Sequence, residues 1–134
     1  MPTTAAELTP AAGEFLTERH LATLTTLRPD GTPHVVAVGF TWDSEAGIAR
    51  IITDTATTKA RNVRRTGYAA VSQVDGARFL TLEGPATVLD DPAAVLAAET
   101  RYTARYKPPR VNPTRVVIAI QVSRVLSSRG LRSA

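Results

Sequence analysis

The sequence predicts a mainly β, α+β domain in which six antiparallel strands form a small barrel with short helices beside it. Runs of strand length, rich in β-branched and apolar residues, alternate with turn signals along the chain. Short turns join consecutive runs, which favours antiparallel neighbours. A strand as apolar as Val35–Phe40 would risk aggregation at an open sheet edge, so closure into a barrel is expected. Residues 1–134 should form this single domain.

The first half of the chain is expected to contain a helix followed by a three-stranded meander. In the turn Pro29-Asp30-Gly31-Thr32, proline sets one backbone angle and glycine supplies a positive one. Asp43–Gly47 forms a second turn. The predicted elements are a helix over 7–19, preceded by loose residues 1–6, and strands over His20–Leu27, His34–Trp42 and 48–53.

The second half is expected to add a basic helix, three strands and a longer helix. Gly84-Pro85 inside a strand predicts a bulge or an edge. Asp91-Pro92 predicts a helix start, because aspartate caps and proline suits the first helical position. The predicted strands are Tyr68–Val74, Arg78–Leu89 and Arg115–Leu126, with a turn at Asp75-Gly76, a helix from Pro92 to about Tyr106, a proline-rich stop over 107–113 and a loose tail over 127–134.

Composition bounds the functions that the chain can have. A net charge of +4 favours acidic partners such as phosphates or carboxylates. The chain has no cysteine, which excludes disulfides and thiolate chemistry and is compatible with a reducing cytoplasm, the expected location. No apolar run approaches the ~20 residues that a membrane span needs, and the acidic N-terminus is unlike a secretory signal.

An anion site is predicted where the strand at residues 48–53 runs into the basic helix. Thr57, Thr58 and Lys59 follow the strand, and the free N–H groups of a helix's first turn attract negative charge. The alternative is that Thr57 or Thr58 only caps a surface helix. A nucleic-acid interface is the rival for a basic chain, but aromatic residues make up only 5% and form no stacking signature.

Other catalytic chemistries lack their patterns. His20 and His34 stand at opposite ends of a hairpin without further ligands at metal spacing, so no metal site is expected. No glycine-bracketed serine suggests a hydrolase nucleophile.

From about Leu8 to Leu126, the chain resembles the split β-barrel superfamily that binds flavins and deazaflavins and includes pyridoxamine phosphate oxidase. Within it, the chain is most similar to the actinobacterial branch that uses coenzyme F420, a deazaflavin, and there to the F420-dependent biliverdin reductases. The resemblance is carried by HLATLTTLRPDGTPHVVAVGFTWD, ARIITDTATTKARNVRRTG, AAVSQVDGARFLTLEGPATV and the terminal P-R-x-N-P-x-R-V-V-I.

The resemblance implies where the cofactor binds. One strand lies along the ring system, the next ends against it, the following turn grips the phosphate, and a turn from the neighbouring subunit of a homodimer closes the pocket. Flavin-binding members tend to carry serine-arginine-lysine at the phosphate, where this chain has Thr57-Thr58-Lys59. The missing positive charge weakens the case for flavin mononucleotide (FMN), which is the alternative cofactor. The residues matched to the strand along the ring system are His34, Val35, Val36 and Ala37, and those matched to the next strand are Ile52 and Thr53. The phosphate-gripping turn matches Thr57, Thr58 and Lys59, and the turn from the neighbouring subunit matches Asp75, Gly76, Ala77, Arg78 and Phe79.

The resemblance further implies hydride transfer from the reduced deazaflavin to a conjugated acceptor, most simply biliverdin, giving bilirubin. Arginines pair with carboxylates, so Arg78, Arg105 and Arg110 are candidates for the acceptor's propionates. No proton donor stands out, since Tyr102 and Tyr106 have the spacing of core residues and solvent can serve. A different acceptor, or a deazaflavin-binding protein without catalysis, is the alternative.

Overall fold

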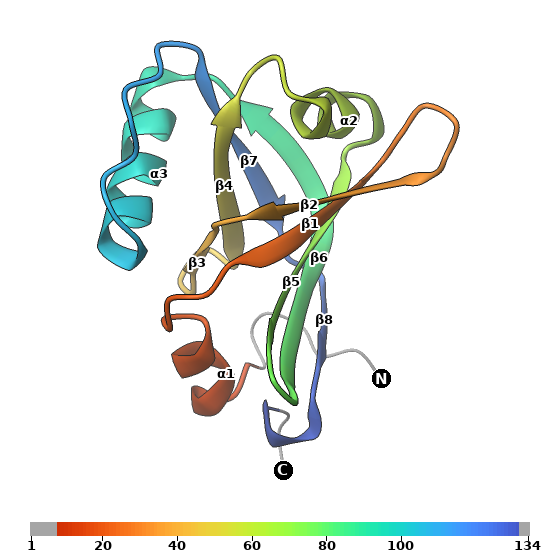
Figure 1. The fold of residues 1–134 in the computed structure, drawn as a ribbon, viewed down its shortest axis with the longest axis vertical. Helices are drawn as coiled ribbons and strands as arrows, with labels where there is room; N and C mark the ends of the chain where they lie inside the picture. The colour runs from red at the N-terminus through yellow and green to blue at the C-terminus, as the bar shows by residue number, and fades with distance from the viewer. Residues whose placement is uncertain (1–7, 132–134) are drawn as a thin grey trace.

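The computed structural model describes residues 8–131, in which one sheet is accompanied by short helices (Figure 1). Within these residues the elements are α1 (Pro10–Phe15), β1 (Ala22–Leu27), β2 (Pro33–Val38), β3 (Thr41–Asp43), β4 (Ile48–Asp54), α2 (Thr58–Thr66), β5 (Tyr68–Asp75), β6 (Arg78–Leu89), α3 (Pro92–Arg105), β7 (Arg115–Gln121), β8 (Arg124–Ser127) and the 3-10 helix η2 (Arg129–Leu131).

The sheet is antiparallel throughout, with strand order β2-β1-β5-β6-β7-β4-β3 and with β8 beside β6. The long β6 pairs with β5 along its first part and with β7 along its second, so it belongs to both halves of the structure. The predicted α+β class with an antiparallel sheet is therefore confirmed, and the split-barrel description holds approximately.

Closure of the sheet, however, is not complete. The end strands β2 and β3 are consecutive in the chain but do not pair with each other. The backbone N–H of Phe40, which lies between them, donates to the Tyr106 hydroxyl at 3.3 Å instead of to a strand. A Cβ on Gly39 would lie 3.0 Å from the Tyr102 ring and 3.1 Å from the Tyr106 ring. Two aromatic rings from the end of α3 thus occupy the place where the barrel would close.

Two predicted strands are each divided, which raises the strand count from six to eight within residues 8–131. The run His34–Trp42 forms β2 and β3, and the run Arg115–Leu126 forms β7 and β8. The second break falls at Val122 and Ser123, whose N–H groups donate to Gly47 and Glu83.

The N-terminal elements are shorter than predicted. α1 begins after Thr9, whose side chain accepts from the Ala12 N–H, and it ends at Phe15. β1 begins at Ala22 rather than at His20. The predicted helix start at residue 7 and the predicted loose residues 1–6 lie outside the described residues. Much of the predicted tail is ordered, because Ser127 belongs to β8 and η2 follows it.

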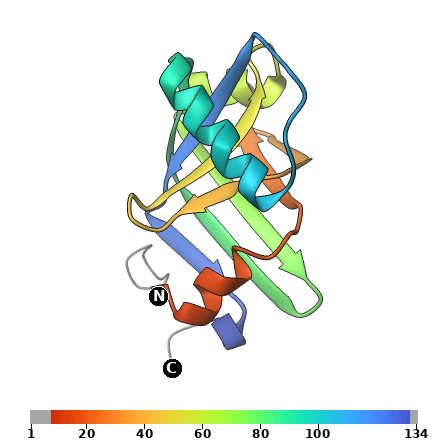
Figure 2. The same ribbon diagram turned by 90° about the vertical axis from the view of Figure 1, so that its left-hand side faces the viewer.

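The core fills the space between the strands with alternate side chains. Leu24, Ile51, Val71, Leu82 and Ile118 are fully buried, each from a different strand. α2 packs on β1 and β6, while α3 packs on β3, β4 and β7. Figure 2 shows α3 lying across these strands, with the loop of residues 107–113 turning back beside it. Among the described residues, no helix combines the length and apolar character that crossing a membrane requires.

Candidate functional site

A groove of about 710 Å³ lies where β2, β4, the start of α2 and the loop of residues 107–113 meet. Strand ends and a helix start converge there, so main-chain groups and polar side chains both reach its surface. Its lining consists of Ala37, Val38, Gly39, Ile52, Thr53, Asp54, Thr57, Lys59, Tyr102, Lys107, Pro108, Pro109, Arg110, Asn112 and Arg115.

Thr57 shapes the end of the groove at α2. It is the N-cap of this helix, and its hydroxyl oxygen lies 3.4 Å from the Ala60 N–H and 3.2 Å from the Thr53 hydroxyl. The same hydroxyl donates to the Asp54 carbonyl at 2.9 Å. The predicted capping role is confirmed, and Thr57 also lines the groove. The N–H groups of Thr58 and Lys59, in the first helical turn, are left without partners in the helix.

Lys59 supplies the positive charge at the end of the groove beside α2. Its side chain is half-buried against the groove, and burial lowers the pKa of its ammonium group. Within residues 8–131 it has no carboxylate or carbonyl partner. Burying a charge without a partner costs free energy, and an anion bound beside Lys59 would offset that cost.

The loop of residues 107–113 forms the opposite wall of the groove and is anchored at its C-terminal end. The Asp54 carboxylate accepts hydrogen bonds from the Thr114 hydroxyl and, at 3.4 Å, from Asn112. The bond from Thr114 is the main reason that the pKa of Asp54 is lowered. Arg115 donates to Glu99 at 2.6 Å and to the Arg110 carbonyl at 2.8 Å.

The anchored loop places two more cations on the groove. Lys107 and Arg110 line it, and their charged groups have no protein partner among the described residues. Arg110, a predicted acceptor-binding residue, therefore lies at the groove, and its role there stays a prediction. Lys107 was not singled out, although the basic, proline-rich run 107–110 was a signal for it.

Several of the residues matched to the cofactor lie together in the groove. These are Ala37, Ile52, Thr53, Thr57 and Lys59. The remaining matched residues of β2 and α2 do not line it. Val35 points outward and is exposed, whereas Val36 packs against the core. Thr58 accepts a bond from Arg61 at 3.3 Å, and His34 has a buried Nδ1 without a partner.

The turn between β5 and β6 lies away from the groove, at the opposite end of the molecule from α2 (Figure 1). Asp75, Gly76, Ala77, Arg78 and Phe79 therefore do not reach the groove of their own chain. Arg78 donates to both carboxylate oxygens of Glu18 at 2.9 Å and also to Asp75, while its guanidinium lies 4.5 Å from the centre of the Phe15 ring. The contribution of residues 75–79 to the pocket of a neighbouring subunit stays a prediction.

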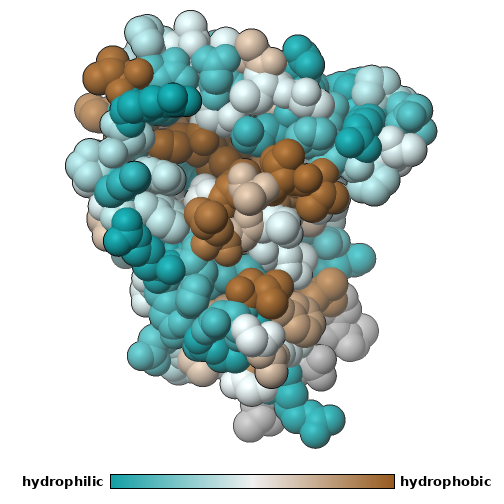
Figure 3. Space-filling view, viewed as in Figure 1, coloured by the Kyte–Doolittle hydropathy of each residue, from teal (hydrophilic) through white to brown (hydrophobic). Residues whose placement is uncertain are grey.

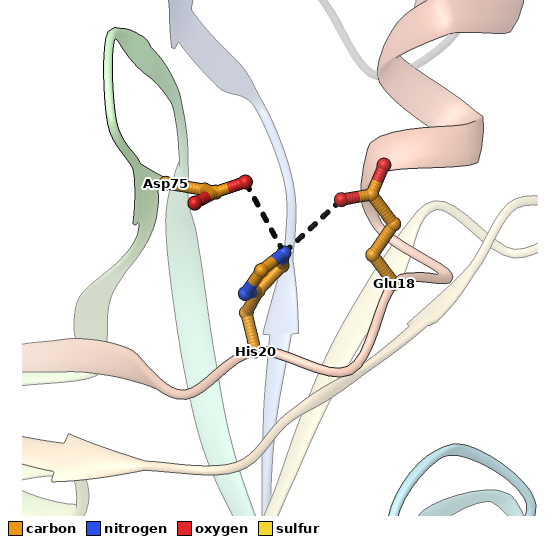
Figure 4. A group of neighbouring side chains, drawn as sticks. All are labelled: Glu18, His20 and Asp75. Atoms are coloured by element: carbon orange, nitrogen blue, oxygen red, sulfur yellow. Dashed lines mark hydrogen bonds and ion pairs between the residues drawn. The ribbon is translucent and has the colours of Figure 1, made fainter.

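Figure 4 shows Glu18, His20 and Asp75 converging beside this turn. Their ligand atoms lie within 4.8 Å of one another, and His20 Nε2 is 3.0 Å from Glu18 and 3.6 Å from Asp75. The Arg78 guanidinium bonds to the same two carboxylates and is the main reason that the pKa of Glu18 is lowered to about 2. A metal ion would have to displace this permanent cation, so the cluster ties the α1–β1 link to the β5–β6 turn.

Arg105, a candidate for binding the acceptor, lies outside the groove. Its guanidinium donates to the Glu18 carbonyl at 2.7 and 3.0 Å, to the Phe40 carbonyl at 2.6 Å and to the Gln73 side chain. The Tyr106 hydroxyl donates to the His20 carbonyl at 2.6 Å, and burial raises the pKa of this phenol. Both side chains are therefore engaged in holding the fold together.

Comparisons with known proteins show which family the chain resembles. The sequence profile of the pyridoxamine 5'-phosphate oxidase family matches residues 8–129. An F420H(2)-dependent biliverdin reductase of Mycobacterium tuberculosis is 56% identical over 131 residues, covering 98% of this chain and 96% of that protein.

Solved structures share the fold. One described as F420 Reductase has a TM-score of 0.69 and 28% identity, over 84% of this chain and 94% of its own. The conserved hypothetical protein Rv2991 of Mycobacterium tuberculosis has a TM-score of 0.76 and 24% identity, over 98% of this chain and 95% of its own.

Proposed function

Because the chain belongs to the pyridoxamine 5'-phosphate oxidase family, we propose that it is an oxidoreductase that uses reduced coenzyme F420 to convert biliverdin to bilirubin. The relative with 56% identity, an F420H(2)-dependent biliverdin reductase, supports the proposal. The observation that carries it in this chain is the half-buried, unpartnered Lys59 at the start of α2. The need for a reduced cofactor and the absence of cysteine support a cytoplasmic location.

The groove offers complementary surfaces for the two ends of such a cofactor. Lys59 and the N–H groups that begin α2 would hold the phosphate, where the helix dipole also favours an anion. Ala37, Gly39 and Ile52 give a weakly polar wall that would hold the ring system. FMN has the same two chemical features and is the alternative.

Reduced F420, when bound, would supply a hydride for the central methine carbon of biliverdin. A pyrrole nitrogen takes up one proton, so the product gains two hydrogens in total. Asp54 is a poor source of this proton, because its pKa is lowered and its oxygens already accept hydrogen bonds. Solvent that enters the open groove is the proposed proton donor.

A homodimer is part of the proposal. The outward face of the sheet carries exposed large apolar side chains from five strands, and burying such side chains against a second chain would favour association. Figure 3 shows apolar atoms gathered across the middle of the molecule, where Figure 1 places the crossing of β1 and β2. Light scattering should give the mass of two chains, and the mass of one chain would contradict this assembly. The exposed apolar side chains on the outward face of the sheet are those of Leu27, Val35, Tyr68, Val74, Phe79 and Leu126.

The direct test mixes the purified protein with reduced F420 and biliverdin and follows the formation of bilirubin. Tight F420 binding without oxidation in the presence of biliverdin would support the non-catalytic alternative. Purification with a bound yellow flavin, and reduction of biliverdin only in the presence of FMN, would support the flavin alternative.

Lys59→Ala should raise the dissociation constant for F420 about tenfold or more. The substitution removes a charge-assisted contact worth roughly 1.5–3 kcal/mol from a partly buried site. Binding can be followed through the fluorescence of the deazaflavin.

Arg61→Ala is the matched control, since it removes one charge from the same helix. The Arg61 guanidinium bonds to Ala56 and Thr58 and does not line the groove. Equal affinities in Lys59→Ala and the unsubstituted protein would remove the anion site from the proposal.

A further inference from the structure

A second hollow of about 280 Å³ adjoins the groove at the C-terminal end of α3. The two cavities share Tyr102 and Lys107, so they are neighbours on the surface. The lining of the hollow is Arg19, His20, Leu21, Tyr102, Tyr106 and Lys107.

The floor of the hollow is aromatic and held in place. The rings of Tyr102 and Tyr106 lie 4.9 Å apart at 35°, and Gly39 leaves room for both. Tyr106 is fixed because its hydroxyl donates to the His20 carbonyl and accepts from the Phe40 N–H. Leu21 borders the hollow and is 65% exposed. The surface is therefore suited to a planar, conjugated ligand.

The rim of the hollow is cationic. Among residues 8–131, Arg19 and Lys107 have no hydrogen-bonding or ion-pair partner, whereas the nearby Arg105 is fully engaged. The nearest acidic side chains, Glu18 and Asp75, do not line the hollow and are bonded to Arg78 and His20 (Figure 4). The free charge at this place is positive, and a carboxylate would complement it.

The hollow lies at the α3 end of the loop of residues 107–113, and Lys59 lies near the other end of this loop. The loop of residues 107–113 leaves α3 beside Tyr106 and His20 and reaches Asp54 at its other end. Thr57, which caps α2, is bonded to Asp54. A cofactor tail that continues beyond a phosphate at Lys59 leads away from the ring, so the hollow remains for the second reactant.

We propose that the hollow is the acceptor's carboxylate subsite, in which Arg19 and Lys107 pair with a propionate of the bilin and Tyr102 supports its conjugated plane. This inference rests on the proposed function. It assigns recognition of the acceptor to Arg19 and Lys107, two residues that sequence reasoning did not select.

The test compares biliverdin with its dimethyl ester, which keeps the conjugated plane but has no carboxylates. Arg19→Gln and Lys107→Gln should each weaken biliverdin binding about threefold to tenfold, as expected for ion pairs at an open rim. Binding of the ester should not change. The measurement is a titration of the cofactor-free protein followed by the visible absorbance of the bilin, repeated as KM for biliverdin with reduced F420.

Arg129→Gln is the matched control, because it also removes one positive charge but lies in η2 and lines neither cavity. It should leave biliverdin affinity and F420 affinity unchanged. Equal losses in all three variants would indicate general electrostatic attraction and overturn the subsite.

The outcome also separates the subsite from the proposed function. Reduction of biliverdin with an unchanged KM in Arg19→Gln and Lys107→Gln would overturn the subsite and leave the proposed function standing. Binding of F420 without any reduction of biliverdin would overturn the proposed function. If the two variants bind biliverdin and its dimethyl ester with equal affinity and still reduce biliverdin, Arg19 and Lys107 bind the carboxylates of the acceptor.

Discussion

Gly84→Ala is expected to destabilise the fold by about 3 kcal/mol or more. Gly84 lies in β6 at the point where the chain between β7 and β8 passes closest to it. A Cβ there would lie 2.0 Å from the Gln121 carbonyl oxygen and 2.9 Å from the Ser123 nitrogen. Both are backbone atoms, and Ser123 is held by its bond to the Glu83 carbonyl at 2.9 Å. One of the two chain segments must shift, which disrupts the pairing of β6 with its neighbours.

Thermal or urea unfolding of Gly84→Ala measures this loss, and Gly13→Ala is its control. Gly13 lies in α1, where an added Cβ meets nothing within 4 Å. Alanine is the better helix former by roughly 0.5–1 kcal/mol, so Gly13→Ala should be neutral or slightly stabilising. A Gly84→Ala protein that unfolds at the same urea concentration as the unsubstituted protein would show that the two segments do not pack closely there.

Local sequence signals predicted the elements whose cause is local. Thr57 and Asp91 cap α2 and α3 as their sequence positions suggested, because a cap depends on three or four neighbouring residues. The turn at Asp75-Gly76 likewise falls where glycine and aspartate predicted it. Gly84-Pro85 predicted a bulge or an edge, but β6 runs unbroken through both residues and pairs there with β5. The break lies instead in the neighbour on its other side, between β7 and β8.

The breaks between strands could not be predicted because their causes are distant in sequence. The run through Gly39 and Phe40 reads as one apolar strand, and it divides because Tyr102 and Tyr106 pack on it. The run through Val122 reads likewise, and it divides where its N–H bonds to Gly47. In both cases the interrupting contact comes from a residue more than 60 positions away.

The same distinction applies to the arginines of the candidate site. The sequence identified Arg78, Arg105 and Arg110 as equivalent candidates for carboxylate binding. In the described structure, Arg110 keeps a free guanidinium, whereas Arg78 and Arg105 bond to groups from other elements. Whether a cation is available to a ligand depends on which acceptors surround it after folding, and those acceptors are far away in sequence.

Arg105→Met should destabilise the protein by about 2–4 kcal/mol. The guanidinium joins α3 to three other segments, because it donates to carbonyls of Glu18 and Phe40 and to the fully buried Gln73 of β5. It also stacks 4.7 Å from the centre of the Phe40 ring. Methionine keeps much of the side-chain volume but leaves these acceptors without donors, and an unsatisfied buried polar group costs about 1–3 kcal/mol. Urea unfolding measures the loss.

Arg101→Met separates this effect from the loss of a charge on α3. Arg101 lies one turn earlier, and its half-exposed side chain makes a single ion pair, to Asp43 at 3.1 Å, so its loss should cost less than about 1 kcal/mol. If Arg105 instead binds the acceptor, Arg105→Met will raise the KM for biliverdin and unfold at the same urea concentration as Arg101→Met. The hydrogen bonds predict the reverse, because a guanidinium whose donors are engaged by the protein has little left to offer a ligand.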